Sequence, residues 1–543
     1  MKRSTMLSAM EDRSTLWDVI IIGGGATGLG AAVEAASRGH RTLLVEAEDF
    51  AKGTSSRSTK LIHGGVRYLR QGRIGMVRQS LLERERLLQN APHVVHSLDF
   101  VLPTWKMGER TVFYAGLRTY DLLAGRLISG RARRLSSSET CDRLPTLRAA
   151  GVRGGVLYSD GQFDDARLAI VLARTAAALG AVVVNYMPVV RLMKIQQRVV
   201  GIVVHDAQSR RELELKGRVI LNATGVFAED VLRMDNNTEG STAANDQPQV
   251  VPSQGSHLVV DASFLPGSTA LMIPKTDDGR VLFAIPWLGK LLLGTTDLEV
   301  KTISREPHPR HQEIDYLLEH TGRYLQRCPG ESDIRSRFAG LRPLVGTRNR
   351  GSSTASLSRE HEIYTAPSGL ITVIGGKWTT YRQMGEELIT KAEIVGDLPR
   401  KPSQTASLRL HGCPANDLPA SAEPGNSYGS DAPEIELLIR ENPDFARPLH
   451  PRLPWLAAHV VWGARFEMAQ SIEDILARRT RALFLDAQAA LESSALVGDL
   501  LQQELQRTNQ WKVREMERFS EIAAGFGAED SDAPQRSSGE QDS

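Results

Sequence analysis

The sequence predicts an α/β fold with three parts: a doubly wound parallel sheet, an antiparallel sheet inserted into it, and a helical C-terminal region. Near the N-terminus, a short apolar strand runs into a glycine-rich turn and a helix of small residues. Strand and helix patterns then alternate, which favours parallel pairing. Residues 250–300 instead contain closely spaced short strands, which favour an antiparallel sheet.

The first βαβ unit comprises residues 18–46, DVIIIGGGATGLGAAVEAASRGHRTLLVE. Gly23 allows a tight turn, Gly25 lets the backbone approach a pyrophosphate, and Gly28 lets the helix pack on the strand. The helix N-terminus offers free N–H groups to phosphates. Glu46 ends the second strand, where a carboxylate can accept from both ribose hydroxyls and would repel a 2′-phosphate. The unit therefore predicts a site for FAD or NAD and disfavours NADP.

A hydroxyl-rich loop follows at residues 54–69, TSSRSTKLIHGGVRYL. Composition alone is equally compatible with a solvated polar loop. The order of the residues, however, closely resembles the signature Ser-Ser-x-x-Ser-Lys-Leu-x-His-Gly-Gly-x-Arg-Tyr-Leu of the aerobic FAD-dependent glycerol-3-phosphate dehydrogenase family. Thr59 stands where many members have serine. The resemblance favours FAD over NAD.

Further segments resemble the same family in the same order. They are residues 158–160, 164–168, 222–225, 255–257, 294–297, 340–344 and 375–382. The similarity spans about residues 18–490. Glycerophosphate oxidases, which use oxygen, share many of these motifs.

The resemblance implies an FAD-binding domain of the glutathione-reductase/D-amino-acid-oxidase-like type, with an inserted antiparallel-sheet substrate domain and a helical C-terminal cap. We expect the domain parts in the following places. The FAD-binding domain is discontinuous within 16–400, at about 16–80, 150–245 and 345–400, with substrate-binding segments at about 81–149 and 246–344, a Pro/Ser/Gly-rich linker at 401–433, a helical domain at 434–527 and a disordered tail at 528–543.

Periodicity places the remaining elements. We expect helices at 74–90 and 166–179, central strands at 182–184, 200–204 and 212–221, and antiparallel strands at 256–260, 270–274, 281–285 and 291–294. Ser471 to Asp474 resembles a capping box. The helix that it opens would have its apolar positions at Ile475, Leu476, Leu483 and Leu485.

The bulk composition is that of a globular enzyme. Lys and Arg total 66 against 64 Asp and Glu, which argues against a nucleic-acid binder. Cys141, Cys328 and Cys413 lack CxxC spacing, so neither a disulfide framework nor a metal site is expected. The basic N-terminus lacks the apolar stretch of a signal peptide. No stretch approaches the ~18 apolar residues of a transmembrane helix.

Residues 106–134 carry seven basic and two acidic residues. The apolar positions at helical spacing are Phe113, Leu117, Tyr120, Ala124 and Leu127. The basic positions opposite or just after them are Arg118, Arg126, Arg131, Arg133 and Arg134. This pattern is typical of a helix on an anionic membrane surface. An ordinary domain helix with a solvated basic face fits equally well, since Gly116 and Gly125 weaken the helix.

The resemblance implies oxidation of sn-glycerol 3-phosphate to dihydroxyacetone phosphate, with electrons passed through FAD to a membrane quinone. A substrate phosphate needs fixed cations, and the planar guanidinium grips phosphate oxygens in pairs. The family match carries this role to Arg67 and Arg342, with help from Tyr68. Lys377 would stabilise a developing alkoxide or an anionic reduced flavin.

The proton acceptor is less defined than the phosphate site. His63 and His361 are candidates because imidazole titrates in the useful range. A water, or an Arg or Lys held partly neutral, could serve instead. The expected catalytic residues are Arg342, Lys377 and His63.

The expected FAD-contacting residues belong to the glycine turn, the hydroxyl loop and two later turns. They are Gly23, Gly25, Gly28, Glu46, Thr54, Ser55, Ser56, Ser58, Lys60, Ala223, Gly225, Gly376, Lys377 and Thr379. We expect a cytoplasmic enzyme, peripherally attached to the inner face of the cell membrane, with a homodimer as one option for its assembly. The alternatives are a glycerophosphate or amino-acid oxidase of the same fold, or a flavin-bound scaffold whose site has decayed.

Overall fold

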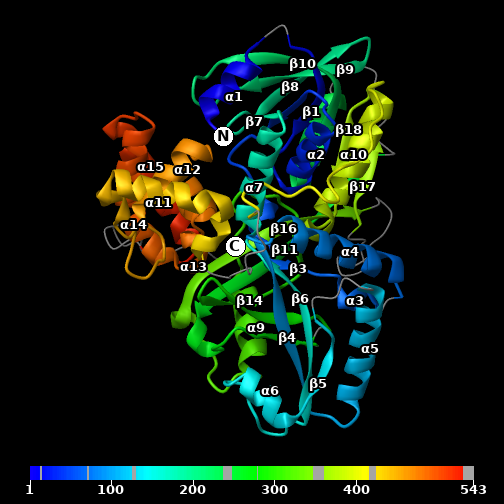
Figure 1. Cartoon of the computed structure of the whole chain (residues 1–543), viewed down its shortest axis with the longest axis vertical. Coiled ribbons are helices and arrows are strands. Elements are labelled where there is room, and N and C mark those ends of the chain that lie inside the picture. The colour runs from blue at the N-terminus through cyan, green and yellow to red at the C-terminus, as the bar shows by residue number, and fades with distance from the viewer. Residues whose placement is uncertain are drawn as a thin grey trace.

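The computed structural model describes residues 1–12, 15–69, 72–124, 130–236, 247–274, 276–277, 279–346, 360–414 and 424–529. One sheet with its helices occupies the upper part of Figure 1, a second sheet the lower part, and the C-terminal helices lie to one side of both. The predicted fold class is confirmed: an α/β domain carries a second sheet and a helical C-terminal region.

The first sheet has the order β17-β18-β10-β1-β2-β7, and β8 and β9 extend it from β10. Its strands are β1 (Trp17–Ile22), β2 (Thr42–Val45), β7 (Val182–Val184), β8 (Val189–Ile195), β9 (Arg198–His205), β10 (Glu212–Asn222), β17 (Glu362–Thr365) and β18 (Ile371–Ile374). β1 pairs in parallel with both β2 and β10. Val19 and Ile21 face one apolar cluster and Ile20 and Ile22 face another, because both faces of the sheet are covered.

The second sheet has the order β15-β11-β14-β13-β12-β4-β6-β3, with β16 on β11 and β5 on β6. Its strands are β3 (Leu61–Ile62), β4 (Val95–Thr104), β5 (Arg133–Leu135), β6 (Gly154–Phe163), β11 (Gln249–Asp261), β12 (Ala270–Ile273), β13 (Leu282–Trp287), β14 (Lys290–Gly294), β15 (Leu298–Glu299) and β16 (Ile334–Gly346). Strand β6 pairs with β4 in this second sheet, although residues from about 150 onward were expected to belong to the FAD-binding domain.

The helices fall into three groups. Around the first sheet are α1 (Arg3–Met10), α2 (Ala26–Ser37), α7 (Asp165–Ala178), α8 (Ala228–Asn236) and α10 (Tyr381–Val395). Beside the second sheet are α3 (Val66–Leu69), α4 (Ile74–Asn90), α5 (Glu109–Ala124), α6 (Ser137–Arg143) and α9 (His311–Gly322). The C-terminal group is α11 (Ala432–Glu441), α12 (Ala457–Phe466), α13 (Ala482–Leu485), α14 (Ala487–Glu504) and α15 (Asn509–Gly525).

Helix α5 forms as predicted, but its apolar stripe faces the protein. Leu117 and Tyr120 are buried, and Tyr120 packs with Val77 and Leu81 of α4. The stripe proposed to lie on a membrane is therefore satisfied by α4 and the neighbouring sheet. Among the described helices, none is long and apolar enough to cross a membrane. Gly125 to Ser129, with Arg126 and Leu127, lie outside the described residues.

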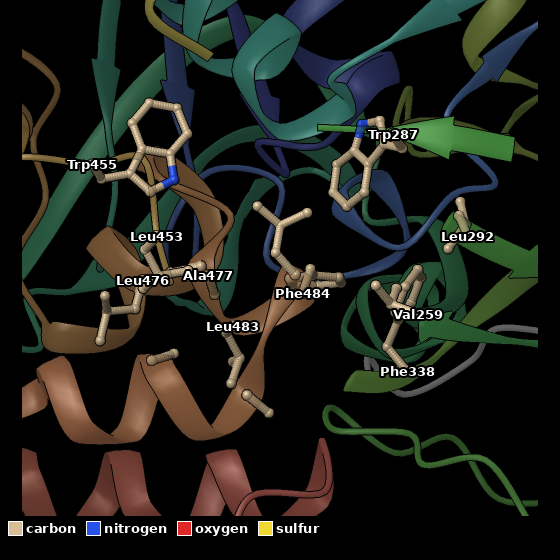
Figure 2. Close-up of a cluster of buried hydrophobic side chains, with 14 of the residues drawn as sticks. Val259, Trp287, Leu292, Phe338, Leu453, Trp455, Leu476, Ala477, Leu483 and Phe484 are labelled. Carbon is tan, nitrogen blue, oxygen red and sulfur yellow. The ribbon is translucent and has the colours of Figure 1, made fainter. Parts of the chain in front are cut away.

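The capping box forms where the sequence places it, and all four of the apolar positions after it are buried. The Asp474 N–H donates to Ser471 Oγ at 3.1 Å, and the Ser471 N–H donates to Asp474 Oδ2 at 3.2 Å. The turn that follows, Asp474–Arg479, is a π-helix rather than a regular α-helix. Figure 2 shows Leu476, Leu483 and Phe484 of this region facing the same core as Trp287 and Phe338 of the second sheet.

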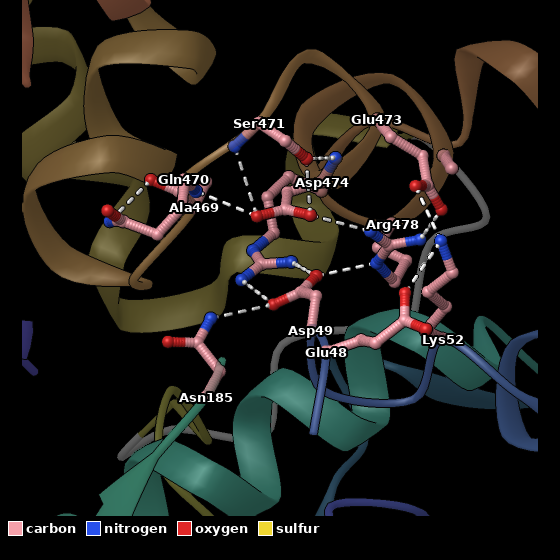
Figure 3. A network of polar contacts seen from close by, with 12 residues as sticks. Glu48, Asp49, Lys52, Asn185, Ala469, Gln470, Ser471, Glu473, Asp474 and Arg478 are labelled. Carbon is pink, nitrogen blue, oxygen red and sulfur yellow. Dashed lines mark hydrogen bonds and ion pairs between the residues drawn. The ribbon is translucent and has the colours of Figure 1, made fainter. Parts of the chain in front are cut away.

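Buried ion pairs attach the C-terminal region to the loop after β2 (Figure 3). The Arg478 Nε donates to Asp49 Oδ2 at 2.5 Å, and Arg479 also pairs with Asp49. The Lys52 Nζ lies 2.8 Å from Glu473 Oε2. This loop begins directly after Glu46, so the C-terminal region holds a segment that the sequence assigns to the dinucleotide site.

Candidate functional site

A cavity of about 570 Å³ is lined by residues of both sheets. Its walls come from the glycine turn after β1, the end of β2, the loop before β3, the turns after β10 and β18, and the edge formed by β11 and β16. Segments that are hundreds of residues apart in the chain therefore face one space.

The glycine turn and Glu46 form one end of the cavity. Gly23 has a φ of 110°, which favours glycine, and Gly25 precedes the first turn of α2. The Glu46 carboxylate accepts from the Gly24 N–H at 2.6 Å and from the Glu48 N–H at 2.9 Å. Burial raises the pKa of Glu46. Two backbone donors thus fix a carboxylate whose free lone pairs can accept from a diol. Gly28 lies behind this wall and packs against Gly23.

The hydroxyl loop closes over the same turn. Ser55 Oγ accepts from the Ala26 N–H at 2.9 Å, and Thr54 Oγ1 donates to Leu341 O at 2.6 Å. Ser58 Oγ donates to Asp165 Oδ2 at 2.7 Å. Thr54, Ser55 and Ser58 line the cavity, as expected from the sequence.

Lys60 and Ser56 lie behind the loop rather than in the cavity wall, which differs from the expected cofactor contact. The Lys60 Nζ donates to Asp165 Oδ2 at 2.7 Å and to Ser56 O at 2.8 Å. It is also surrounded by the rings of Trp287, Phe338 and Phe484. Burial lowers the pKa of Lys60 to about 7. The ammonium holds the loop from its core side.

A second pair of turns forms the middle of the cavity. Ala223, Gly225, Gly376, Lys377 and Thr379 all line it. The His63 N–H donates to Thr379 Oγ1 at 3.3 Å, and that hydroxyl lies 3.4 Å from His63 O. The His63 loop and the Lys377 loop therefore lie side by side.

Arg342 reaches the cavity from β16. One terminal nitrogen donates to Thr295 Oγ1 at 3.0 Å and to Thr296 O at 3.1 Å, and the other lies 3.5 Å from Asp297 Oδ1. The guanidinium keeps 21% of its side-chain surface exposed. These contacts orient a cation that can still bind an anion.

His257 also lines the cavity, and no role was predicted for it from the sequence. Its Nε2 lies 2.9 Å from Thr59 Oγ1, and its ring stacks on Phe338 at 4.8 Å between centroids. Burial, and then the charges of Lys60 and Arg342, lower the pKa of His257 well below its ordinary value. A neutral imidazole therefore faces the same space as Arg342. The segment 255–257 was the available signal, since it matched the family without an assigned chemistry.

Three of the expected site residues, Arg67, Tyr68 and His361, are not among the described side chains that line the cavity. Arg67 and Tyr68 lie in α3, and the two residues before them, Gly65 and Val66, line the cavity. The side chains of Arg67 and Tyr68 lie outside the described part of the structure. His361 pairs through Nε2 with Glu387 Oε2 at 2.7 Å and lies outside the cavity wall.

The site can hold an extended dinucleotide and a small anion. The glycine turn, the N-terminus of α2 and Glu46 suit a diphosphate and a ribose. Lys377, Arg342 and the neutral His257 offer two cations and a base at the other end.

Known proteins carry the same architecture. Residues 18–382 match the family described as FAD dependent oxidoreductase, and residues 373–512 match the C-terminal domain of alpha-glycerophosphate oxidase. The chain is 36% identical to a mitochondrial glycerol-3-phosphate dehydrogenase of Arabidopsis thaliana, over 94% of this chain and 86% of that protein. It is 32% identical to one from Saccharomyces cerevisiae, over 94% and 90%.

Solved structures agree with these relatives. A glycerol-3-phosphate dehydrogenase from Bacillus halodurans, complexed with FAD, has a TM-score of 0.78 and 28% identity, covering 96% of this chain and 97% of that one. An L-alpha-glycerophosphate oxidase from Mycoplasma pneumoniae, with FAD bound, has a TM-score of 0.54 and 17% identity, covering 72% and 98%. The second likeness concerns the fold alone.

Proposed function

Because the chain belongs to the FAD-dependent glycerol-3-phosphate dehydrogenases, we propose that it oxidises sn-glycerol 3-phosphate to dihydroxyacetone phosphate and passes the electrons to a membrane quinone. One observation supports this reaction above all. An oriented Arg342 and a neutral His257 line the same cavity as the glycine turn that suits FAD. An anion-binding group and a base are the two protein functions that oxidation of a phosphorylated alcohol requires.

The residues present fit FAD. Gly25 and the first turn of α2 would hold the pyrophosphate, Glu46 the ribose, and Thr54, Ser55 and Ser58 further polar atoms. The turns at Ala223, Gly225, Gly376 and Thr379 would flank the rest of the cofactor. When bound, FAD supplies the hydride acceptor.

Phosphate recognition is assigned to Arg342 together with Arg67 and Tyr68. Arg342 is already oriented by Thr295 and Thr296, so little side-chain entropy would be lost on binding. Lys377 lines the cavity beside the His63 loop, where its charge can stabilise a developing alkoxide.

His257 is the preferred proton acceptor. The imidazole is neutral at working pH and offers a lone pair to the substrate hydroxyl, and its lowered pKa makes it a weaker base than an ordinary histidine. The contact with Thr59 Oγ1 holds the ring in place. His63 remains the second candidate, because it lines the cavity too.

The membrane contact is assigned to the outer face of α5 and the basic cluster after it. Val112 and Leu122 are 69% and 73% exposed, and Met107 just before the helix is 85% exposed. Arg131, Arg133 and Arg134 are exposed as well. Apolar side chains next to basic ones are typical of a helix lying in an anionic interface. The enzyme would then act at the inner face of the cell membrane. A homodimer is compatible with this arrangement.

Anaerobic mixing tests the substrate. FAD-loaded protein should lose its flavin absorbance when glycerol 3-phosphate is added, and should not when glycerol or a neutral amino acid is added. Absence of bleaching by glycerol 3-phosphate would refute the substrate assignment. Bleaching by the amino acid would instead indicate an amino-acid oxidase.

Reoxidation of the same reduced sample tests the acceptor. A soluble quinone should restore the absorbance much faster than dissolved oxygen does. Faster recovery with oxygen, with release of peroxide, would make the protein a glycerophosphate oxidase.

A further inference from the structure

A tyrosine on the inner face of α5 bonds the loop that carries His63. The Gly64 N–H donates to Tyr120 Oη at 2.7 Å, and that hydroxyl donates to Asp160 Oδ2 at 2.9 Å. Gly64, Tyr120 and Asp160 are all buried. One hydroxyl group thus joins a surface helix, the His63 loop and strand β6.

The hydroxyl has a fixed direction. The Arg84 guanidinium donates to Asp160 Oδ1 at 2.7 Å, and its other arm lies 2.7 Å from Glu85 Oε1. The carboxylate is therefore held from the side opposite Tyr120. Burial raises the pKa of Tyr120 well above its ordinary value, so the phenol stays protonated and keeps donating.

Packing leaves this contact little freedom. Tyr120 packs in a small apolar cluster with Val77 and Leu81 of α4. A Cβ at position 64 would lie 2.5 Å from Tyr120 Oη and 2.7 Å from Leu81 Cδ2. Glycine is therefore required at the point where the loop meets the helix.

The loop that carries His63 and Gly64 is part of the site, whereas Tyr120, which bonds to that loop, is not. His63, Gly65 and Val66 line the cavity, and Tyr120 lies outside its wall. The backbone of His63 also contacts Thr379 Oγ1. The loop continues directly into α3, which contains Arg67. A change at Tyr120 can therefore alter the substrate end of the cavity without touching substrate or cofactor.

We propose that Tyr120 is a positioning residue: its hydroxyl sets the place of the His63–Arg67 loop and so the affinity for glycerol 3-phosphate. The inference rests on the proposed function for the identity of the substrate. Removing the hydroxyl takes one acceptor from the buried Gly64 N–H, which also interacts with the Asp160 carboxylate, and frees that carboxylate on one side. The bonds that hold the Glu46 carboxylate come from Gly24 and Glu48 and do not involve Tyr120, so we expect FAD binding to be retained.

Tyr120→Phe is the test variant, and Tyr114→Phe is its matched control. Tyr114 is on the same helix, with its ring 4.5 Å from the Arg134 guanidinium carbon. Steady-state rates are measured with a soluble dye as acceptor. We expect Tyr120→Phe to raise the KM for glycerol 3-phosphate about tenfold with a smaller change in kcat. FAD content and flavin spectrum should match those of Tyr114→Phe, whereas the melting temperature of the FAD-loaded protein should be slightly lower because buried hydrogen bonds are lost.

A second variant separates positioning from general destabilisation. Gly64→Ala alone should raise the KM strongly, because its Cβ meets Tyr120 Oη. In the Gly64→Ala/Tyr120→Phe double variant the contact with Oη is gone while the one with Leu81 Cδ2 remains, so the combined effect should exceed that of Tyr120→Phe but be less than the product of the single effects.

The outcomes are distinguishable. If glycerol 3-phosphate fails to bleach the flavin of the parent protein, the proposed function fails. If the parent is active while Tyr120→Phe keeps the parental KM, the positioning role is wrong. If the effects of the two substitutions on the KM for glycerol 3-phosphate simply multiply in the double variant, the link between Tyr120 and Gly64 is wrong.

Discussion

Two glycines of the same turn have different tasks at the scale of single residues. A Cβ at Gly28 would lie 1.9 Å from Gly23 O, whereas one at Gly25 would meet only Ser55 Oγ, at 3.0 Å. Gly28→Ala should therefore destabilise the apoprotein by about 1–3 kcal/mol through overpacking. Gly25→Ala should leave the apoprotein nearly as stable as the parent and weaken FAD, because its methyl group occupies the pyrophosphate approach.

Thermal melting of the two apoproteins and flavin-fluorescence titrations with FAD measure these effects. Equal FAD affinity in Gly25→Ala and the parent would show that the cofactor does not approach this turn.

Arg342 should discriminate between a phosphorylated and an unphosphorylated substrate. Losing one charged contact in a largely desolvated site costs about 2–5 kcal/mol. Arg342→Ala should raise the activation free energy that corresponds to kcat/KM for glycerol 3-phosphate by that amount. Any activity on glycerol should change far less. Arg335→Ala is the control, since Arg335 is on the same strand but pairs with Asp261 at 2.7 Å outside the cavity. Similar kinetics in both variants would remove Arg342 from the phosphate site.

Residue identities were predictable where a local pattern dictates the chemistry. Gly23 and Glu46 act within one βαβ unit, so their spacing alone indicates a nucleotide site. The depth of Lys60 could not be read locally, because it depends on Trp287 and Phe484 from distant segments. His257 was missed for the same reason: the pairing of β11 with β16 places it opposite Phe338.

At the scale of elements, buried ion pairs attach the π-helix Asp474–Arg479 to the loop after β2. Burial alone would raise the pKa of Asp49, but the Arg479 and Arg478 guanidiniums hold it below its ordinary value. A depressed folded-state pKa adds stability above the unfolded-state pKa, and that stability is lost as the pH falls through the folded value. The melting temperature should therefore fall steeply below about pH 4.

Asp49→Asn leaves two buried guanidiniums short of a charge and should cost about 3–5 kcal/mol at neutral pH. Its melting temperature should also depend less on pH in the acid range than that of the parent. Asp499→Asn is the control, because Asp499 is 55% exposed and pairs only with the surface residue Lys512. If the melting temperature of Asp49→Asn falls with acid pH as much as that of the parent does, other carboxylates govern acid unfolding.

The predicted elements were reliable where periodicity and burial agree. The strand at Trp17–Ile22 and the capping box at Ser471 form where expected. Helix α5 forms as well, and of the two interpretations left open for its apolar stripe the structure favours the ordinary domain helix, because Leu117 and Tyr120 pack against the protein. The hydrophobic periodicity of a helix shows only that one of its faces is apolar, and the tertiary fold then determines what covers that face.

At the scale of the whole molecule, the outer face of α5 and its basic cluster predict reversible docking. Each basic residue near an anionic leaflet contributes about 1 kcal/mol, screened by salt. Replacing Arg131, Arg133 and Arg134 with Gln should lower binding to anionic vesicles and quinone-linked turnover. Turnover with a soluble dye should persist, since none of the three lines the cavity.

Vesicle co-sedimentation at rising ionic strength measures this docking. Leu122→Asn gives an independent variant, since it removes apolar surface without changing charge. Undiminished vesicle binding in both variants would place the membrane contact on another surface.

The first sheet also imposes an order on biosynthesis. A ribosome releases β1 and β2 early, but β18 at Ile371–Ile374 and the arginines that neutralise Asp49 emerge only much later. Until then, the nascent chain holds Asp49 without the arginines that allow its burial. The N-terminal half therefore cannot mature as an independent unit during translation. We expect cofactor loading to be a post-translational event, and chains released early to need chaperones or be degraded.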